Sequence, residues 1–250
     1  MGRIATPRVS SSLSDRLDAD TRSEAGNGRP GSGRRSTGEI VAEHVRQLVF
    51  DGVLRPGDRI PQGALALELG VSRLPVREAV IELARDGLVT VTPHAGAFVG
   101  PFDAGVLREH FEIVGLVQGL AARDLCNAPD PTALDAMDEA LAEIDAAAAA
   151  GDPVTTHTAT MRFLRTLNLA GGSARQQAVL RALARMLPTG FFAEVPGAAE
   201  AERLGSHRIL DAIRSGHPSA AQRACVEVQR AHGELVVTHQ RARGVFAPGV

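Results

Sequence analysis

Two helices joined by a tight turn account best for residues 68–88, ELGVSRLPVREAVIELARDGL. Ser72 is a natural N-cap, and Pro75 is tolerated in a first helical turn because it lacks only an N–H that has no partner there. Apolar residues recur at helical spacing up to Gly87, where the second helix is expected to stop. This pattern predicts a helix-turn-helix.

The flanking segments extend this unit. Residues 37–51 place apolar side chains at helical intervals after Ser36 or Thr37, either of which can act as a cap. In residues 88–99 apolar and polar side chains alternate, and the alternation is interrupted at PHAG, which indicates a two-strand hairpin. Three helices followed by a hairpin predict a winged helix-turn-helix.

In such a unit the second helix of the turn presents its first residues to the major groove of DNA. Ser72, Arg73 and Arg77 lie in these first turns, and arginine can bind guanine O6 and N7 through two hydrogen bonds. The alternative is that both arginines are solvated or pair with acidic residues of their own helix. His94 and Gly96 form the expected wing tip, where glycine permits close approach to DNA. The DNA-binding set predicted from the sequence is therefore Ser72, Arg73, Pro75, Arg77, His94 and Gly96.

Composition favours a mostly helical chain. The 250 residues are 44% hydrophobic and only 3% aromatic, and all 27 basic residues are arginine. The net charge of −2 provides no overall basic field. Cys126 and Cys225 lie in or at the end of helical patterns and are expected to be reduced, and no apolar run is long enough to span a membrane. A cytoplasmic protein without a membrane segment is the expectation.

The predicted fold class is mostly α, with an N-terminal winged helix-turn-helix and a C-terminal all-α bundle. Residues 1–36, rich in Gly, Ser, Arg and Pro, are predicted to form a disordered tail, followed by the winged domain at 37–100. Residues 101–242 show six or seven helical segments with short loops, which predicts a bundle with room for a central pocket. Residues 243–250 are predicted to be a flexible tail.

The motifs GVSRLPVREA and DGLV, together with GAFV in the wing, resemble the GntR superfamily of bacterial transcription regulators. The helical remainder resembles its fatty-acid-regulator-like subgroup, which carries a helical effector domain of the FCD type. The resemblance implies a homodimer, most often a repressor, on a near-palindromic double-stranded DNA operator that is modulated by a small-molecule effector. The sequence differs from the family pattern at one position of the second predicted helix, where Gly63 or Ala64 stands in place of an arginine that some relatives carry.

Many members of the subgroup hold a metal in the effector pocket, using Asp-x-x-x-His on one helix and one His on each of two later helices. The matched positions in this chain carry no such ligands, and the usual arginine and glutamate of the first bundle helix are also replaced. The predicted pocket consists of Val114, Gln118, Thr160, Leu164, Ser206 and Val228. We therefore expect no metal cofactor and a small neutral or apolar effector. An alternative is that no effector binds and the bundle only dimerises.

A displaced metal site is a further alternative. His157 shares a helical face with Thr160, and His232 lies one turn beyond Val228. His157 thus precedes the family's ligand position at Thr160, and His232 follows the one at Val228. If these two helices run antiparallel, both histidines are displaced toward the same end of the bundle. Solvated or core-edge histidines are the simpler interpretation.

Enzymes form a different class of function. The sequence shows no nucleophile–His–acid cluster and no phosphate-binding loop, so catalysis is not predicted. A constitutive DNA-binding dimer without an effector remains an alternative to a ligand-responsive regulator.

Overall fold

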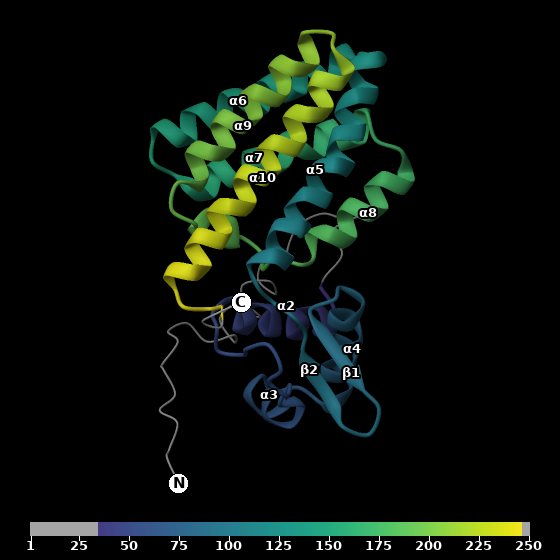
Figure 1. The fold of residues 1–250 in the computed structure, drawn as a ribbon, viewed down its shortest axis with the longest axis vertical. Helices are drawn as coiled ribbons and strands as arrows, with labels where there is room; N and C mark the ends of the chain where they lie inside the picture. The colour runs from purple at the N-terminus through teal and green to yellow at the C-terminus, as the bar shows by residue number, and fades with distance from the viewer. Residues whose placement is uncertain (1–34, 247–250) are drawn as a thin grey trace, which may run out of the picture.

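The computed structural model describes residues 35–246. Figure 1 shows a small winged domain at the bottom and a helical bundle above it. The elements of the winged domain are α2 (Thr37–Phe50), α3 (Gln62–Glu68), α4 (Arg73–Arg85), β1 (Val89–Thr92) and β2 (Gly96–Val99). The elements of the bundle are α5 (Ala104–Asn127), α6 (Pro131–Ala149), α7 (Pro153–Ala170), α8 (Ala174–Ala184), the 3-10 helix η1 (Phe191–Glu194), α9 (Ala198–Arg214) and α10 (Pro218–Ala242). The predicted fold class is confirmed.

The winged domain follows from local sequence signals. Ser36 caps α2 with a capping box, in which Glu39 bonds back to the backbone N–H of Ser36. Strands β1 and β2 pair antiparallel from Val89↔Val99 to Thr92↔Gly96, as the hairpin prediction required. Apolar side chains from the helices and the hairpin pack into one core.

Arg46 links α2 to the end of α4. Its side chain is buried, and its guanidinium bonds to Glu43 at 2.8 Å, Asp86 at 3.3 Å and Glu82 at 3.5 Å. A buried guanidinium requires such carboxylate partners because desolvation of an unpaired charge is very costly. The network therefore holds α4 at a defined angle to α2.

In the bundle, α5 and α10 lie in very close contact along their length. A Cβ added to Gly119 would lie 2.8 Å from the carbonyl oxygen of Gln222, and one added to Gly115 would lie 2.9 Å from the Cα of Val226. Such contacts leave no room for a side chain. The two glycines therefore allow the two backbones to approach each other.

Helices α6, α7 and α9 complete the bundle core. Asp130 and Asp152 cap α6 and α7, each followed by a proline at the first helical position. Arg208 on α9 pairs with Glu227 on α10, and His232 lies near Ala201, so these two helices run antiparallel. The loosely patterned residues 188–203 contain η1 and the first turn of α9.

The end of the chain departs from the prediction of a flexible tail beginning at residue 243. The guanidinium of Arg243 bonds to Asp51 at 2.6 Å, and Val245 is buried against Gly52. Phe246 packs near Phe102. Residues 243–246 are therefore part of the contact between the bundle and the winged domain, whereas residues 247–250 lie outside the described part, as do residues 1–34.

A second contact between the two domains comes from the segment before α9. Arg185 pairs with Asp86 at 3.2 Å, and the backbone N–H of Thr189 donates to Glu43 at 2.5 Å. The ring of Phe191 meets that of Phe50 edge-on, with centroids 4.9 Å apart. Two stretches of the bundle chain thus hold the winged domain at its α2 side.

Cys126 and Cys225 are both free and buried, as predicted. Burial raises the pKa of the Cys225 thiol to about 12, so this thiol is protonated and unreactive. None of the helices in the described part combines the length and apolar character that crossing a membrane requires.

Candidate nucleic-acid interface and bundle interior

The start of α4 is exposed. Ser72 is its N-cap residue, but its side chain forms no capping hydrogen bond to any described residue. Ser72, Arg73 and Arg77 are all exposed, and Pro75 is half-buried between them. The hydroxyl and the first backbone N–H groups of the helix are therefore available to a phosphate.

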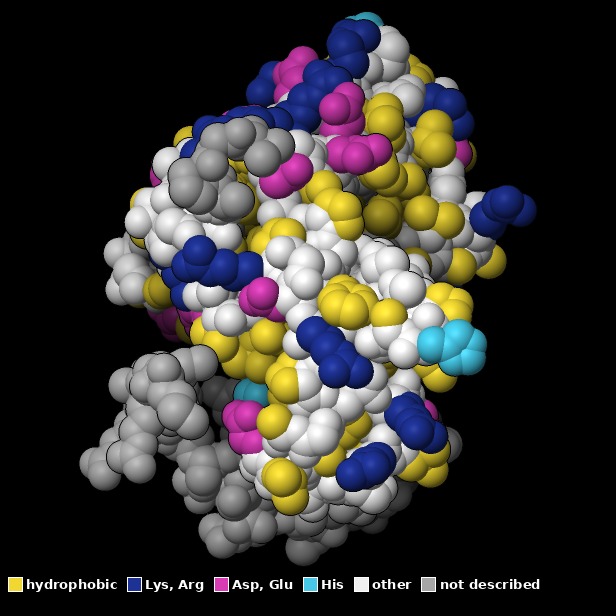
Figure 2. All heavy atoms as spheres, turned by 60° about the horizontal axis from the view of Figure 1, so that its bottom comes forward, with side chains coloured by type: hydrophobic (Ala, Val, Ile, Leu, Met, Phe, Trp, Pro, Cys, Tyr) yellow, Lys and Arg dark blue, Asp and Glu magenta, His cyan; other side chains and the backbone are white. Residues whose placement is uncertain are grey.

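Within the described residues neither Arg73 nor Arg77 forms an ion pair. The acidic residues of α4 face the other way: Glu82 bonds to Arg46 of α2, and the Glu78 side chain lies against Gly38 of α2. Among the described residues, the two arginines are thus left without an acidic partner on the outer face. Figure 2, which brings the bottom of the molecule forward, shows separate basic side chains at this end.

The wing tip is shaped by its backbone. His94 is exposed and has φ 61°, a left-handed conformation that is uncommon outside glycine. Gly96 has φ 121°, and a Cβ on it would lie 3.0 Å from Nε of Arg59. Glycine is therefore needed at this position for the turn and for the packing of Arg59.

Two exposed residues near this surface were missed by sequence reasoning. Arg59 pairs through its backbone with Phe98 and extends its side chain along the wing beside Gly96. Leu74 is 65% exposed in the first turn of α4, beside Arg73. Leu74 could have been found from the sequence, because it occupies the variable position of the motif GVSRxPVREA. Arg59 could not have been found in this way, because only the folded structure brings it to the wing.

The six residues of the predicted effector pocket lie in the bundle interior, five of them buried. Val114 on α5 is half-buried. The side-chain oxygen of Gln118 accepts a hydrogen bond from the side-chain amide of Gln229 at 2.9 Å, so this oxygen already has one partner within the protein. The buried members are Gln118, Thr160, Leu164, Ser206 and Val228.

A polar cluster of His157, Glu202 and His232 lies beside these residues; the sequence points to the two histidines but not to Glu202. His157 on α7 bonds through Nδ1 to Glu202 on α9 at 2.6 Å. Glu202 is 2% exposed, and burial raises the pKa of its carboxyl group, while the bond to His157 acts in the opposite direction. Burial also lowers the pKa of His232 to about 4, so this imidazole is neutral near pH 7.

The 3-10 helix η1 touches this cluster and the winged domain with adjacent residues. The ring of Phe192 lies 5.0 Å from that of His232 and 6.0 Å from that of His157. Its neighbour Phe191 packs on Phe50 of α2. One dipeptide therefore connects the bundle interior with the core of the winged domain.

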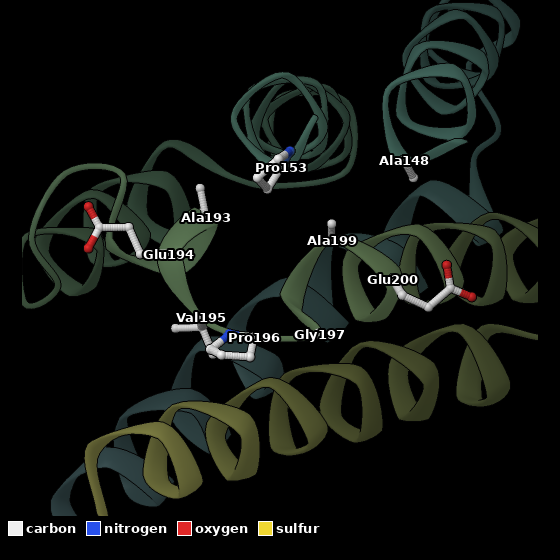
Figure 3. Close-up of a pocket in the computed structure, with 9 residues that line it drawn as sticks. All are labelled: Ala148, Pro153, Ala193, Glu194, Val195, Pro196, Gly197, Ala199 and Glu200. Carbon is white, nitrogen blue, oxygen red and sulfur yellow. The ribbon is translucent and has the colours of Figure 1, made fainter. Parts of the chain in front are cut away.

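An open hollow of about 390 Å³ lies at the N-terminal ends of α7 and α9. Figure 3 shows Pro153 on one side, Ala199 and Glu200 on another, and the segment from Ala193 to Gly197 closing the rest. Glu194 and Glu200 make its rim acidic. A hollow of this size suits a small molecule but disfavours an anion.

The two histidines of the displaced metal site do lie at the same end of the bundle, both beside the ring of Phe192. In residues 35–246 no group of three or more His, Cys, Asp or Glu side chains is placed to hold a metal ion. Nδ1 of His157 is already bonded to Glu202. The displaced metal site therefore gains no third ligand from the described chain.

Known proteins match both domains. Residues 37–99 match the model of bacterial regulatory proteins of the gntR family, and residues 109–231 match the FCD domain. A probable D-xylose utilization operon transcriptional repressor of Paenarthrobacter nicotinovorans is 30% identical over 203 residues, which are 76% of this chain and 86% of that protein. An HTH-type transcriptional regulator of Mycobacterium tuberculosis is 28% identical over 216 residues, which are 86% and 87% of the two chains.

Solved structures agree with these matches. A GntR transcriptional regulator from Rhodococcus sp. RHA1 aligns with TM-score 0.53 and 26% identity over 80% of this chain and 98% of its own. The Lar protein that controls the Listeria monocytogenes agr system aligns with TM-score 0.59 at 17% identity over 83% and 99%, which supports the fold. The exposed start of α4, the wing and the helical bundle, together with these matches, identify the chain as a member of the GntR family of DNA-binding transcription regulators with an FCD C-terminal domain, a family of regulators and not of enzymes.

Proposed function

We propose that this regulator reads a near-palindromic operator as a homodimer, mainly as a repressor, and that a small neutral molecule in the bundle modulates its DNA binding. The observation that carries the DNA-reading part is the pair Arg73 and Arg77. Both are exposed in the first turns of α4, and the acidic residues of that helix face α2. Two guanidinium groups that form no ion pair within residues 35–246, on a helix that fits the major groove, are suited to guanine.

Arg73→Ala and Arg77→Ala are each expected to weaken operator binding by about 1–3 kcal/mol and to relax specificity at one base pair per half-site. The reason is that each change removes one base contact made with two hydrogen bonds. The measurement is a binding titration against the operator, against operators with single substitutions, and against random DNA, at one fixed salt concentration.

Arg85→Ala is the matched control, because Arg85 is also exposed on α4 but lies in its last turn. Its replacement should leave the operator preference unchanged. Unchanged operator affinity in both the Arg73 and the Arg77 variant would refute this assignment. An equal loss on operator and random DNA would instead assign the two arginines to phosphate contacts.

We expect two protein chains on each operator. One recognition helix reads only a few base pairs, which is too little for specificity in a genome, and a two-fold pair doubles that readout. Analytical ultracentrifugation of the protein alone and with a single operator duplex tests this. One chain per operator at saturating protein would contradict the dimer.

The effector is proposed to be neutral because of what lines the bundle interior. Leu164 and Val228 belong to an apolar core, and a carboxylate buried beside them without a cation would lose its hydration without compensation. Gln118, Thr160 and Ser206 are the polar groups available to orient a ligand. An effector that binds more tightly to one arrangement of the helices would shift the spacing of the two recognition helices.

A further inference from the structure

Five buried side-chain polar atoms of the bundle have no hydrogen-bond partner among the described residues. Three of them, Oγ1 of Thr160, Oε2 of Glu202 and Nε2 of His232, belong to one end of the bundle, and the other two are Oδ1 of Asn168 and Oε1 of Gln240. Thr160, Glu202 and His232 are 2%, 2% and 6% exposed and come from α7, α9 and α10. Buried polar atoms in proteins are nearly always bonded to protein, water or a ligand, so three together indicate that a molecule completes them.

The three residues lie at one level of the bundle. His157, one turn before Thr160, bonds to Glu202, and His232 lies near Ala201 on the turn that carries Glu202. A Cβ on Gly205, which follows Glu202 by three residues, would lie 3.6 Å from Nε2 of His232. Helices α7, α9 and α10 therefore present these polar groups at the same end of the bundle.

The open hollow gives this end of the bundle room for a ligand. Pro153 lies one turn before His157, Ala193 directly follows Phe192, and Glu200 is two residues before Glu202. The hollow and the cluster therefore draw on the same stretches of α7, η1 and α9, although none of the three cluster residues lines the hollow. The side chain of His157 is 19% exposed, so the cluster is not fully sealed on this side.

We infer that Thr160, Glu202 and His232 bind a small neutral molecule that donates hydrogen bonds through N–H or O–H groups, such as an amide or an alcohol. This inference rests on the proposed effector response and specifies the chemistry of the ligand. Glu202 has one oxygen bonded to His157 and one left to accept, and a neutral His232 offers a second acceptor. The Thr160 hydroxyl can accept or donate.

Charged ligands fit this cluster poorly. An anion would face the Glu202 carboxylate and pass the acidic rim formed by Glu194 and Glu200. The carboxylate oxygen Oε1 of Glu202, which could serve as the counter-ion of a cation, is already bonded to Nδ1 of His157. Full charges that lack a buried counter-ion are strongly disfavoured in an interior of low dielectric constant.

Occupancy of this cluster can reach the winged domain through η1. Phe192 packs against both histidines of the cluster, and Phe191 packs against Phe50 of α2. A ligand bound against Phe192 would displace η1 and the segment before it, in which the backbone N–H of Thr189 donates to Glu43 of α2. Such a ligand would therefore change the position of α2 relative to the bundle.

The test uses three probes of similar size and different charge: butyramide, butyrate and butylammonium. Binding to the full-length protein is measured by saturation-transfer NMR and by the shift of the thermal unfolding midpoint. We expect butyramide to bind and to raise the midpoint, and the two ions to bind at least fivefold more weakly. Absence of butyramide binding, or equal binding of butyrate, would overturn the inference.

Thr160→Val is expected to weaken butyramide binding roughly fivefold, because one hydrogen bond to the ligand is lost. Thr156→Val is the matched control on the same helix, since Thr156 is equally buried but donates to the backbone oxygen of Asp152 at 2.7 Å. It should lower the unfolding midpoint and leave probe binding unchanged. Equal probe affinity of the wild type and the Thr160 variant would also overturn the inference.

The inference and the proposed function can fail separately. Probe binding is measured without DNA, and operator binding by the wild type is measured without probe. Operator binding with no butyramide binding would remove the ligand class and leave the DNA-reading proposal intact. Butyramide binding by a protein that selects no operator would do the reverse.

Discussion

Phe191→Ala is expected to destabilise the protein by about 3–5 kcal/mol, the usual cost of removing a phenyl ring from a packed core. Phe191 is 2% exposed, and its ring meets that of Phe50 at 4.9 Å and that of His239 at 6.0 Å. The cavity would open between α2 and the end of α10, so the winged domain should also become less firmly attached to the bundle. Urea unfolding followed by circular dichroism measures the loss.

The matched control is Phe246→Ala. Phe246 is only half-buried at the same junction, with its ring 6.0 Å from that of Phe102. Its replacement should cost less than half as much, because less apolar area is lost from the core. Equal losses for the two variants would show that Phe191 is not an anchor of the junction. A second, earlier unfolding transition in the Phe191 variant would show that the winged domain now unfolds separately.

Acidification is expected to unfold the bundle through His110 and His232. Burial lowers the pKa of each to about 4 from an ordinary value of 6.5. Because the folded state binds these protons more weakly than the unfolded state, the stabilisation is complete above pH 6.5 and is lost as the pH falls toward 4. Each histidine accounts for about 3 kcal/mol across that range.

The free energy of unfolding measured in urea at several pH values between 7.5 and 4.5 tests this. His110→Leu and His232→Leu should each flatten the fall in stability at acid pH, whereas His94→Asn at the exposed wing should not. Glu202 acts in the opposite direction, because burial raises its pKa and the folded state then binds a proton more tightly as the pH falls. Parallel pH profiles of the wild type and both Leu variants would contradict the assignment.

Much of the DNA-binding unit could be predicted because its signals are local. Ser36 and Ser72 stand at helix starts, Gly87 ends α4, and the PHAG break marks the hairpin. These features depend on residues a few positions apart, so periodicity and capping rules identify them. The sequence also indicates the outer face of α4, since the buried residues of that helix follow its apolar spacing.

In the bundle, local sequence patterns do not predict which side chains of different helices meet. The resemblance predicts that Thr160, Leu164, Ser206 and Val228 stand at the family's metal-ligand positions, but no motif predicted the pair of His157 and Glu202. These two residues are 45 positions apart, and only the packing of α7 beside α9 brings them to 2.6 Å. Glu202 lies in an ordinary charged stretch, AEAERLG, where a solvated side chain would be expected.

The amino-acid sequence by itself determined the order and type of the elements and the residues that α4 exposes. These properties depend on side-chain chemistry and on contacts within one helix or hairpin. Tertiary structure alone decided that Arg59 lies beside Gly96, that residues 243–246 close on α2, and that η1 lies between Phe50 and His232. The physical reason is that burial and pairing depend on groups from distant parts of the chain, whose positions are set by how whole helices pack.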